Sequence, residues 1–132
     1  MTVQAAILNL QAKALALSGM KSAPDAPPDA AGAFPFAASY ERIGKMVTHS
    51  YGFSHELVTI FTELHVTRQN LTVAIDTAMP FRDPFLVAIR NDPTLGGTIS
   101  TIEEVRWTFG ALKWGTVDTI GYRFEIDVKV AI

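Results

Sequence analysis

The chain lacks cysteine altogether, and its basic residues are few and scattered. The absence of cysteine excludes disulfides, thiolate nucleophiles and cysteine-based zinc sites. Charged residues make up 18% of the 132 residues, the net charge is -2, and Lys and Arg form no cluster. Proteins that bind DNA tightly neutralise phosphates with clustered cations. The composition therefore argues against a nucleic-acid-binding groove.

No apolar run in the sequence is long enough to span a bilayer. The first segment, MTVQAAILNLQAKALALSGM, is apolar, but it lacks the basic start of a signal peptide and carries Lys13 within its apolar part. We therefore expect a soluble, intracellular protein that makes no membrane contact.

Hydrophobic residues, in contrast, are abundant, at 48% of the chain. A chain of this length suits one domain, 1–132, with a core of its own. The apolar content exceeds what a small monomer easily hides, so it favours contacts between subunits.

The first 33 residues are predicted to form a helix followed by an arm. Residues 1–20 carry apolar side chains at three- and four-residue spacing, which predicts an amphipathic helix that covers a sheet and ends at Gly19. Leu8 and Leu15 lie off this apolar stripe and are candidate subunit contacts. Residues 21–33, KSAPDAPPDAAGA, have the composition of an extended proline-rich linker or arm.

Two strands are predicted next, at 34–40 and 55–69, with a polar, glycine-containing loop from Arg42 to Ser54 between them. A loop of this length between paired strands is usually functional. Its candidate partner-contacting residues are Lys45, His49, Tyr51 and Phe53. In the second strand, Leu57 and Phe61 lie on the face opposite the apolar stripe and are further candidate interface residues.

A broken helix is predicted in the centre of the chain. Asn70 is placed to cap a first helix that buries Leu71, Ile75 and Ala78 and ends before Pro80. Asp83 is placed to cap a second helix, with proline at its first position and Pro93 beyond its end.

The chain ends in a predicted antiparallel hairpin that follows Gly96 and Gly97. Val105, Trp107 and Phe109 share one face of its first strand, and the last strand alternates regularly from Ile120 to Val130, with GALKWGTVDT as the connection. Arg106 and Arg123 could pair with Glu104, Glu125 or Asp127 on the outer face. These elements predict an α+β fold: a mostly antiparallel sheet of about four strands, with the N-terminal helix and the broken helix packed on it.

Few residues in the sequence suggest chemistry. The histidines, at 49, 55 and 65, have no zinc-site spacing, and Glu63 and His65 are expected to form a solvated or hydrogen-bonded pair. No catalytic, metal-binding or cofactor-binding residue is predicted. A less favoured alternative is a small ligand-binding or enzymatic domain with a pocket around His49, Tyr51 and His55.

The aromatic residues of the terminal hairpin, Trp107, Phe109 and Trp114, raise a further alternative. They could form a stacking platform for single-stranded nucleic acid, but such platforms normally lie in a basic groove. Core packing is the favoured interpretation, followed by an interface role.

The order of elements over residues 34–131, and above all the turn DPTLGG leading into a hairpin that contains WTFGALKWG and GYRFEIDVKV, resembles the tail terminator proteins of long-tailed, non-contractile, lambda-like bacteriophages. Neck and tail-completion adaptor proteins look similar at this level. A bacterial secretion-tube component is a further alternative.

The resemblance implies a non-enzymatic structural protein of the virion, located at the tail-neck junction and assembled in the host cytoplasm. It would form a homo-oligomeric ring, a hexamer in that family, which stops growth of the tail tube and joins the tail to the head. The implied partners are further copies of the chain, the tail tube protein and a head-side connector or neck protein. DNA would pass through the ring without specific binding.

Overall fold

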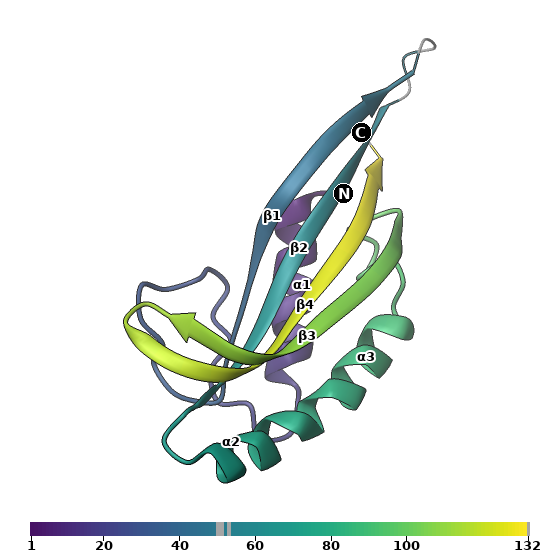
Figure 1. Ribbon diagram of the computed structural model, residues 1–132. Helices are drawn as coiled ribbons and strands as arrows, with labels where there is room; N and C mark the ends of the chain where they lie inside the picture. The colour runs from purple at the N-terminus through teal and green to yellow at the C-terminus, as the bar shows by residue number, and fades with distance from the viewer. Residues whose placement is uncertain (50–51, 53, 132) are drawn as a thin grey trace.

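The computed structural model describes residues 1–49, 52 and 54–131. Its elements, in chain order, are α1 (Val3–Leu15), β1 (Phe36–Thr48), β2 (Ser54–Thr67), α2 (Leu71–Ala78), a short 3-10 helix η1 (Met79–Phe81), α3 (Arg82–Arg90), β3 (Thr101–Trp114) and β4 (Val117–Ala131). The strands form one antiparallel sheet in the order β1-β2-β4-β3 (Figure 1). The predicted α+β fold, with its N-terminal and central helices, is confirmed.

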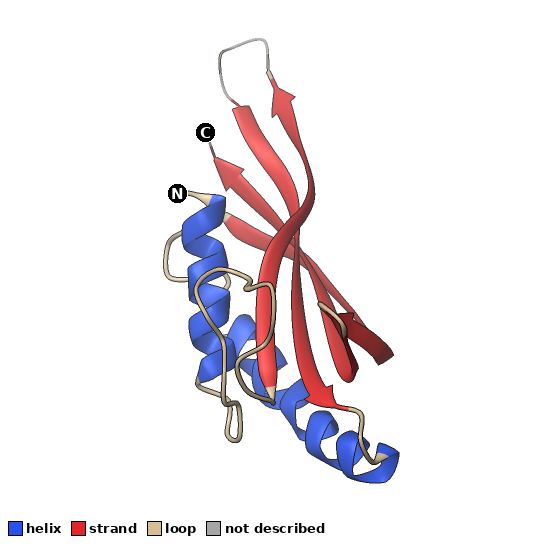
Figure 2. Ribbon diagram, turned by 90° about the vertical axis from the view of Figure 1, so that its left-hand side faces the viewer, coloured by secondary structure: helices blue, strands red, loops and turns tan. Residues whose placement is uncertain are grey.

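The hydrophobic core lies between one face of the sheet and the helices. Alternate side chains of β2 and β4 point to this face, as the sequence pattern predicted. Ala6, Leu10 and Ala14 of α1 are fully buried, and the ring of Phe85 in α3 lies 4.8 Å from that of Phe124 in β4. Figure 2 shows α1 on this side of the sheet, while no helix covers the other side of its upper half.

The N-terminal helix begins as its sequence predicts, but it is shorter. Thr2 is the N-cap, and its hydroxyl accepts a hydrogen bond of 3.0 Å from the amide of Ala5. The helix ends at Leu15, and Gly19, with a φ of 92°, lies in the turn that follows. The chain therefore leaves the helix one turn earlier than expected.

Residues 21–33 form an arm that is fastened to the body at several points. Ser22 makes a parallel bridge with Phe36. The side-chain amide of Gln11 donates to the carbonyl of Pro24 at 2.8 Å, and the indole N–H of Trp114 donates to the carbonyl of Pro28 at 2.9 Å. The arm has little regular structure, but these bonds fix its course beside α1 and the tip of the β3–β4 hairpin.

The predicted loop from Arg42 to Ser54 is wrong, because most of it is strand. β1 continues to Thr48 and β2 begins at Ser54, so the two strands form a long hairpin that projects beyond the helices (Figure 1). The register shifts between Glu41 and Ile43, which places one extra residue in β1. Beyond this bulge β1 is largely exposed, so its sequence lacks the apolar alternation that marks a half-buried strand.

The central helices differ from the prediction in which residues of α2 are buried and in how α3 begins. Asn70 caps α2 as expected, its side-chain oxygen accepting from Val73. Leu71, which was expected to be buried, is 53% exposed, and Ala74 is buried in its place. Asp83 does not cap α3 but lies in its first turn and pairs with Arg82, because η1 leads directly from α2 into α3 without a break.

The terminal hairpin is longer than predicted. Most of the expected connection is strand, and the turn is reduced to Gly115 and Thr116. The tip curls over the face of the sheet that α1 leaves open, which brings the ring of Trp114 within 5.4 Å of that of Phe36. Core packing holds only in part for the other two aromatics, since Trp107 and Phe109 remain 39% and 38% exposed.

Candidate functional site

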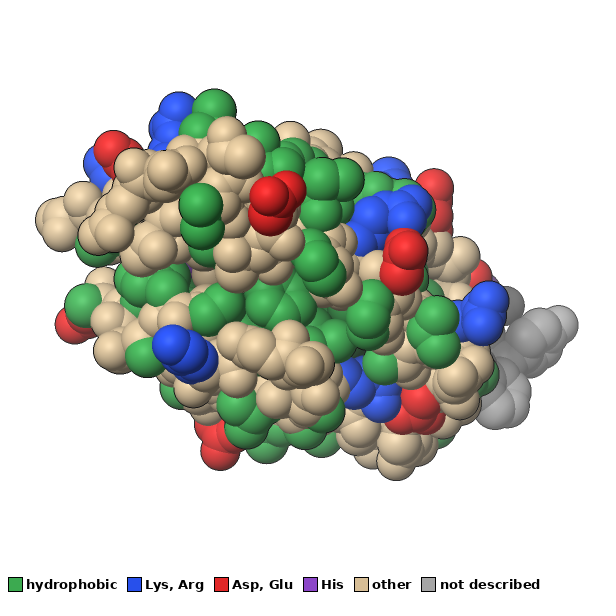
Figure 3. All heavy atoms as spheres, turned by 90° about the horizontal axis from the view of Figure 1, so that it is seen from below, with side chains coloured by type: hydrophobic (Ala, Val, Ile, Leu, Met, Phe, Trp, Pro, Cys, Tyr) green, Lys and Arg blue, Asp and Glu red, His purple; other side chains and the backbone are tan. Residues whose placement is uncertain are grey.

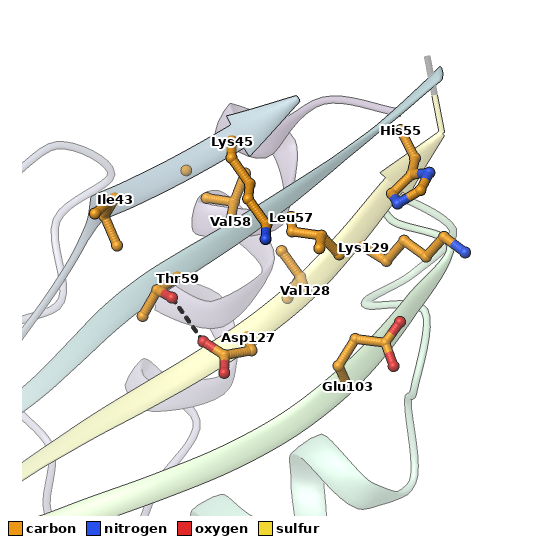
Figure 4. Close-up of a pocket in the computed structure, with 11 residues that line it drawn as sticks. Ile43, Lys45, His55, Leu57, Val58, Thr59, Glu103, Asp127, Val128 and Lys129 are labelled. Carbon is orange, nitrogen blue, oxygen red and sulfur yellow. Dashed lines mark hydrogen bonds between the residues drawn. The ribbon is translucent and has the colours of Figure 1, made fainter. Parts of the chain in front are cut away.

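The main hollow among the described residues is a groove of about 610 Å³ on the open face of the sheet, at the base of the projecting hairpin (Figure 4). All four strands contribute to it. We call this hollow the open-face groove. It is lined by Ile43, Gly44, Lys45, His55, Leu57, Val58, Thr59, Glu103, Asp127, Val128 and Lys129.

One row of side chains across three strands defines the floor and rim of the groove. Lys45 of β1 pairs in register with Leu57 of β2, which pairs with Lys129 of β4. Directly opposed residues point to the same face of an antiparallel sheet, so the two ammonium groups flank one apolar side chain. Neither lysine belongs to an ion pair among the described residues.

In the next row of the groove, formed by Thr59 and Asp127, the polar side chains already bind one another or Arg106. Thr59 donates to Asp127 at 2.6 Å, and Arg106 binds the same carboxylate at 2.6 Å while also binding Glu104 at 2.9 Å. The Arg106 contact holds the pKa of Asp127 below its usual range. The predicted charge ladder is thus confirmed for Arg106. Lys45, Lys129 and His55 of the groove form no ion pair with any described residue, and the exposed Glu103 lies across the groove from them.

The histidines of the hairpin stack on one another and give no catalytic arrangement. The rings of His49 and His55 lie 5.4 Å apart, nearly parallel. Partial desolvation, together with the positive charge of Lys129 and neighbouring His49, lowers the pKa of His55. His55 lines the groove but His49 does not. Tyr51, the third residue of the hypothetical ligand pocket, lies outside the described residues.

The predicted interface residues occupy two sides of the molecule. Leu8 and Leu15 are 39% and 52% exposed on the outside of α1. Leu57 lies in the open-face groove. Phe61 lies further down the same face and is half-buried, its ring 5.7 Å from that of Tyr40.

The four residues of the predicted partner loop do not lie in one loop. Lys45 is a strand residue that lines the groove, and His49 lies just beyond the end of β1. Tyr51 and Phe53 lie outside the described residues, so their proposed contacts are not placed.

A buried polar cluster lies beneath the curled tip of the β3–β4 hairpin. Glu63, which is 2% exposed, accepts from the hydroxyl of Tyr40 at 2.6 Å and from Arg123 at 2.9 Å. His65 is fully buried, with Nδ1 2.6 Å from the hydroxyl of Thr119. Sequence alternation predicted the Glu63 and His65 pair, but the other three members come from β1 and β4.

Glu63 and His65 form the pair at the centre of this cluster. His65 Nε2 lies 2.9 Å from Glu63 Oε1, within ion-pair distance, but the alignment does not meet hydrogen-bond geometry. Burial alone would raise the pKa of Glu63, but His65, Tyr40 and Arg123 together hold it below its usual range. Phe36 and Trp114 pack on His65, so the cluster stabilises the hairpin tip and does not line the groove.

Apolar side chains also gather across the lower face of the molecule (Figure 3). The exposed large apolar residues of the central helices and the terminal hairpin are Leu71, Val73, Met79, Val87, Trp107, Phe109 and Val117. The guanidinium of Arg82 lies 4.8 Å from the centre of the Trp107 ring, a cation–π contact that covers part of this surface.

Two searches of the described residues are negative. They contain no group of three or more His, Cys, Asp or Glu side chains arranged to hold a metal ion. None of the described helices has the length and apolarity needed to cross a membrane.

The chain was also compared with known proteins. Neither the known protein families nor the curated proteins contain a match to this chain. The function must therefore be argued from the surfaces described above.

Proposed function

We propose that this protein is a structural component of a bacteriophage virion that forms a ring on the end of the tail tube, stops tube growth and joins the tail to the head-side connector. The ring is a homo-oligomer, in keeping with the hexamer that the sequence resemblance implies. Its place is the tail-neck junction, and it is assembled in the host cytoplasm. The role requires complementary surfaces and a central opening, and no catalytic group.

The observation that carries this proposal is that apolar side chains reach the surface on two opposite sides of the molecule, one formed by the nearly uncharged α1 and the other flanked by lysines. On one side, the only charged residue of α1 is Lys13, which is paired with Asp92 at 2.7 Å, and the helix leaves Leu8 and Leu15 exposed. On the other side, the open-face groove presents Leu57. Different surfaces on opposite sides are what a head-to-tail ring requires, since each subunit binds two neighbours by unlike patches.

The projecting β1–β2 hairpin and the lower apolar face supply contacts beyond the ring itself. Ile43 and Met46 of the hairpin are 64% and 63% exposed and are available for contact with another protein. These surfaces lie at opposite ends of the sheet. One end can therefore bind the tail tube while the other meets the connector.

The direct test is electron microscopy of the purified chain, alone and mixed with tail tubes assembled from the tube protein encoded near it. We expect rings with a central opening, either free or on one end of each tube, and tubes that stop growing once capped. A chain that neither forms rings nor binds tube ends at micromolar concentration would contradict the proposal. Binding to the head portal in place of the tube end would assign it to the neck.

A further inference from the structure

We infer that the open-face groove binds the proline-rich arm of the next copy of the chain, with Asp25 and Asp29 of the arm facing Lys45 and Lys129 of the groove. This inference rests on the proposed ring and specifies its contact between subunits. It assigns a partner to the groove, which is open among the described residues.

The arm is suited to be a ligand because it is held in place before binding. Hydrogen bonds to the carbonyls of Pro24 and Pro28 fasten it to the body, so a partner need not order it. Asp25 and Asp29 are both exposed and belong to no ion pair among the described residues. From residue 22 to residue 33 these carboxylates are the only charges.

The groove has the complementary character. Its free cations, Lys45 and Lys129, flank Leu57, so it offers an apolar floor between two positive groups. His55 adds a donor, while Asp127 is neutralised by Arg106 and Glu103 stands exposed at the rim. An apolar, acidic segment without bulky side chains fits this arrangement, and the arm, made mostly of Ala and Pro with two Asp, has that composition.

The spacing of the charges agrees with this pairing. Lys45 and Lys129 are two strand spacings apart, which is about 9.5 Å between backbones. Asp25 and Asp29 are four positions apart, and the chain bends at both of them, so their separation is less than the about 12 Å of an extended segment. The flexible lysine side chains can cover the difference.

The positions of arm and groove also suit a closed ring. The arm lies beyond the β1 edge of the sheet, and the groove lies on the open face, so the contact joins two different surfaces (Figures 1 and 4). Such a contact propagates from copy to copy and closes when the rotation between copies allows it.

Cysteine trapping tests the contact directly, because the chain has no cysteine of its own. Ala26→Cys in one copy and Leu57→Cys in a second, tagged copy are mixed and oxidised with copper phenanthroline. We expect a mixed dimer joined through the two new thiols. The matched control pairs Ala26→Cys with Val87→Cys, since Val87 is 41% exposed on α3, and should give little mixed dimer.

Charge reversal then tests the chemistry of the contact. With Lys45→Glu and Lys129→Glu in the groove copy, the yield of mixed dimer should fall about tenfold, because two attractions become repulsions. Adding Asp25→Lys and Asp29→Lys to the arm copy should restore the yield. Reversal of Asp76 and Asp118, both exposed elsewhere, should leave it unchanged.

These experiments test the contact between arm and groove independently of the proposed role at the tail tube. Mixed dimers that charge reversal weakens and paired reversal restores support it, even if no tube is capped. Absence of mixed dimers, dimers joined through two Leu57→Cys copies, or indifference to charge reversal overturns it. Groove variants that still form rings but no longer join tails would also overturn it, because the groove would then bind another protein.

Discussion

A single methyl group added at Gly121 should disrupt the junction between β2 and β4. Gly121 lies opposite His65 in the ladder, and a Cβ atom there would stand 1.8 Å from the carbonyl oxygen of Leu64. Real Cβ atoms essentially never approach a heavy atom more closely than 3.0 Å, so the strands would have to separate by at least 3.0 minus 1.8, or 1.2 Å. The neighbour is backbone in a central strand and cannot rotate away.

The expected cost follows from what such a separation would break. Moving β4 away weakens about two ladder hydrogen bonds, each worth about 1 kcal/mol, and opens the bond between His65 and Thr119. With the loss of packing around it, we expect Gly121→Ala to destabilise the fold by about 3–5 kcal/mol, a large part of the stability of a small domain. The melting temperature should fall by about 10–20 °C.

The assay is urea unfolding followed by circular dichroism and tryptophan fluorescence. Gly32→Ala is the matched control, because a Cβ there meets nothing within 4 Å, and it should change the free energy of unfolding by less than about 0.5 kcal/mol. Gly121→Ala should also shift the tryptophan emission to longer wavelength as Trp114 loses its contact with Phe36. If the two variants unfold at the same urea concentration, the close approach of β4 to β2 is incorrect.

Four further predictions concern the open face, the buried cluster and the distribution of charge. Phe61→Glu should keep the wild-type circular dichroism spectrum while weakening self-association. The reason is that Phe61 is half-buried on the open face, where the guanidinium of Arg123 lies 5.3 Å from its ring. An unfolded variant would instead show that Phe61 belongs to the core. Folding lowers the pKa values of Glu63 and Asp127, so the stability that these two carboxylates contribute should be fully present above about pH 5 and be lost as the pH falls through their folded pKa values. Glu63→Gln should lower the free energy of unfolding by about 2–4 kcal/mol at neutral pH and make its decrease at acidic pH smaller. A variant as sensitive to acid as the wild type would contradict the role of Glu63. Fluorescence anisotropy should show no submicromolar binding of duplex DNA at physiological salt, because the chain is acidic and its cations are dispersed.

Much of the fold was predictable because the buried strands and helices carry their period in the sequence. β2 and β4 each bury alternate residues against the helices, and this period of two is visible without any structure. Asn70 could be identified as a cap because its side chain serves the local backbone. The terminal hairpin was expected for the same reasons, although its length was underestimated.

The projecting hairpin could not be predicted from the same signals. Between Glu41 and Thr48, β1 is exposed apart from the partly buried Val47, so nothing in its sequence needs to alternate. Its strand conformation depends on pairing with β2, which is a property of the register and not of the local residues. A glycine-containing polar segment of this kind is indistinguishable from a loop until its partner is known.

The groove was only partly predictable, since its defining row spans most of the chain. The sequence predicts Leu57 on the second face of its strand, but it places Lys45 in a loop. Only the pairing of β1 with β2 and of β2 with β4 places these two residues and Lys129 side by side. The polar cluster shows the same limit, because Tyr40 and Arg123 reach Glu63 from neighbouring strands.

The distribution of exposed apolar residues argues for several partners rather than one. They lie on three parts of the molecule: the outside of α1, the open face with its hairpin, and the lower face. A simple twofold dimer would cover one self-complementary patch and leave the others in water. A ring subunit that also stacks on a tube uses all three, since each of two neighbours covers a different side and the axial partner covers an end. The proposed ring would therefore account for the high apolar content of the chain.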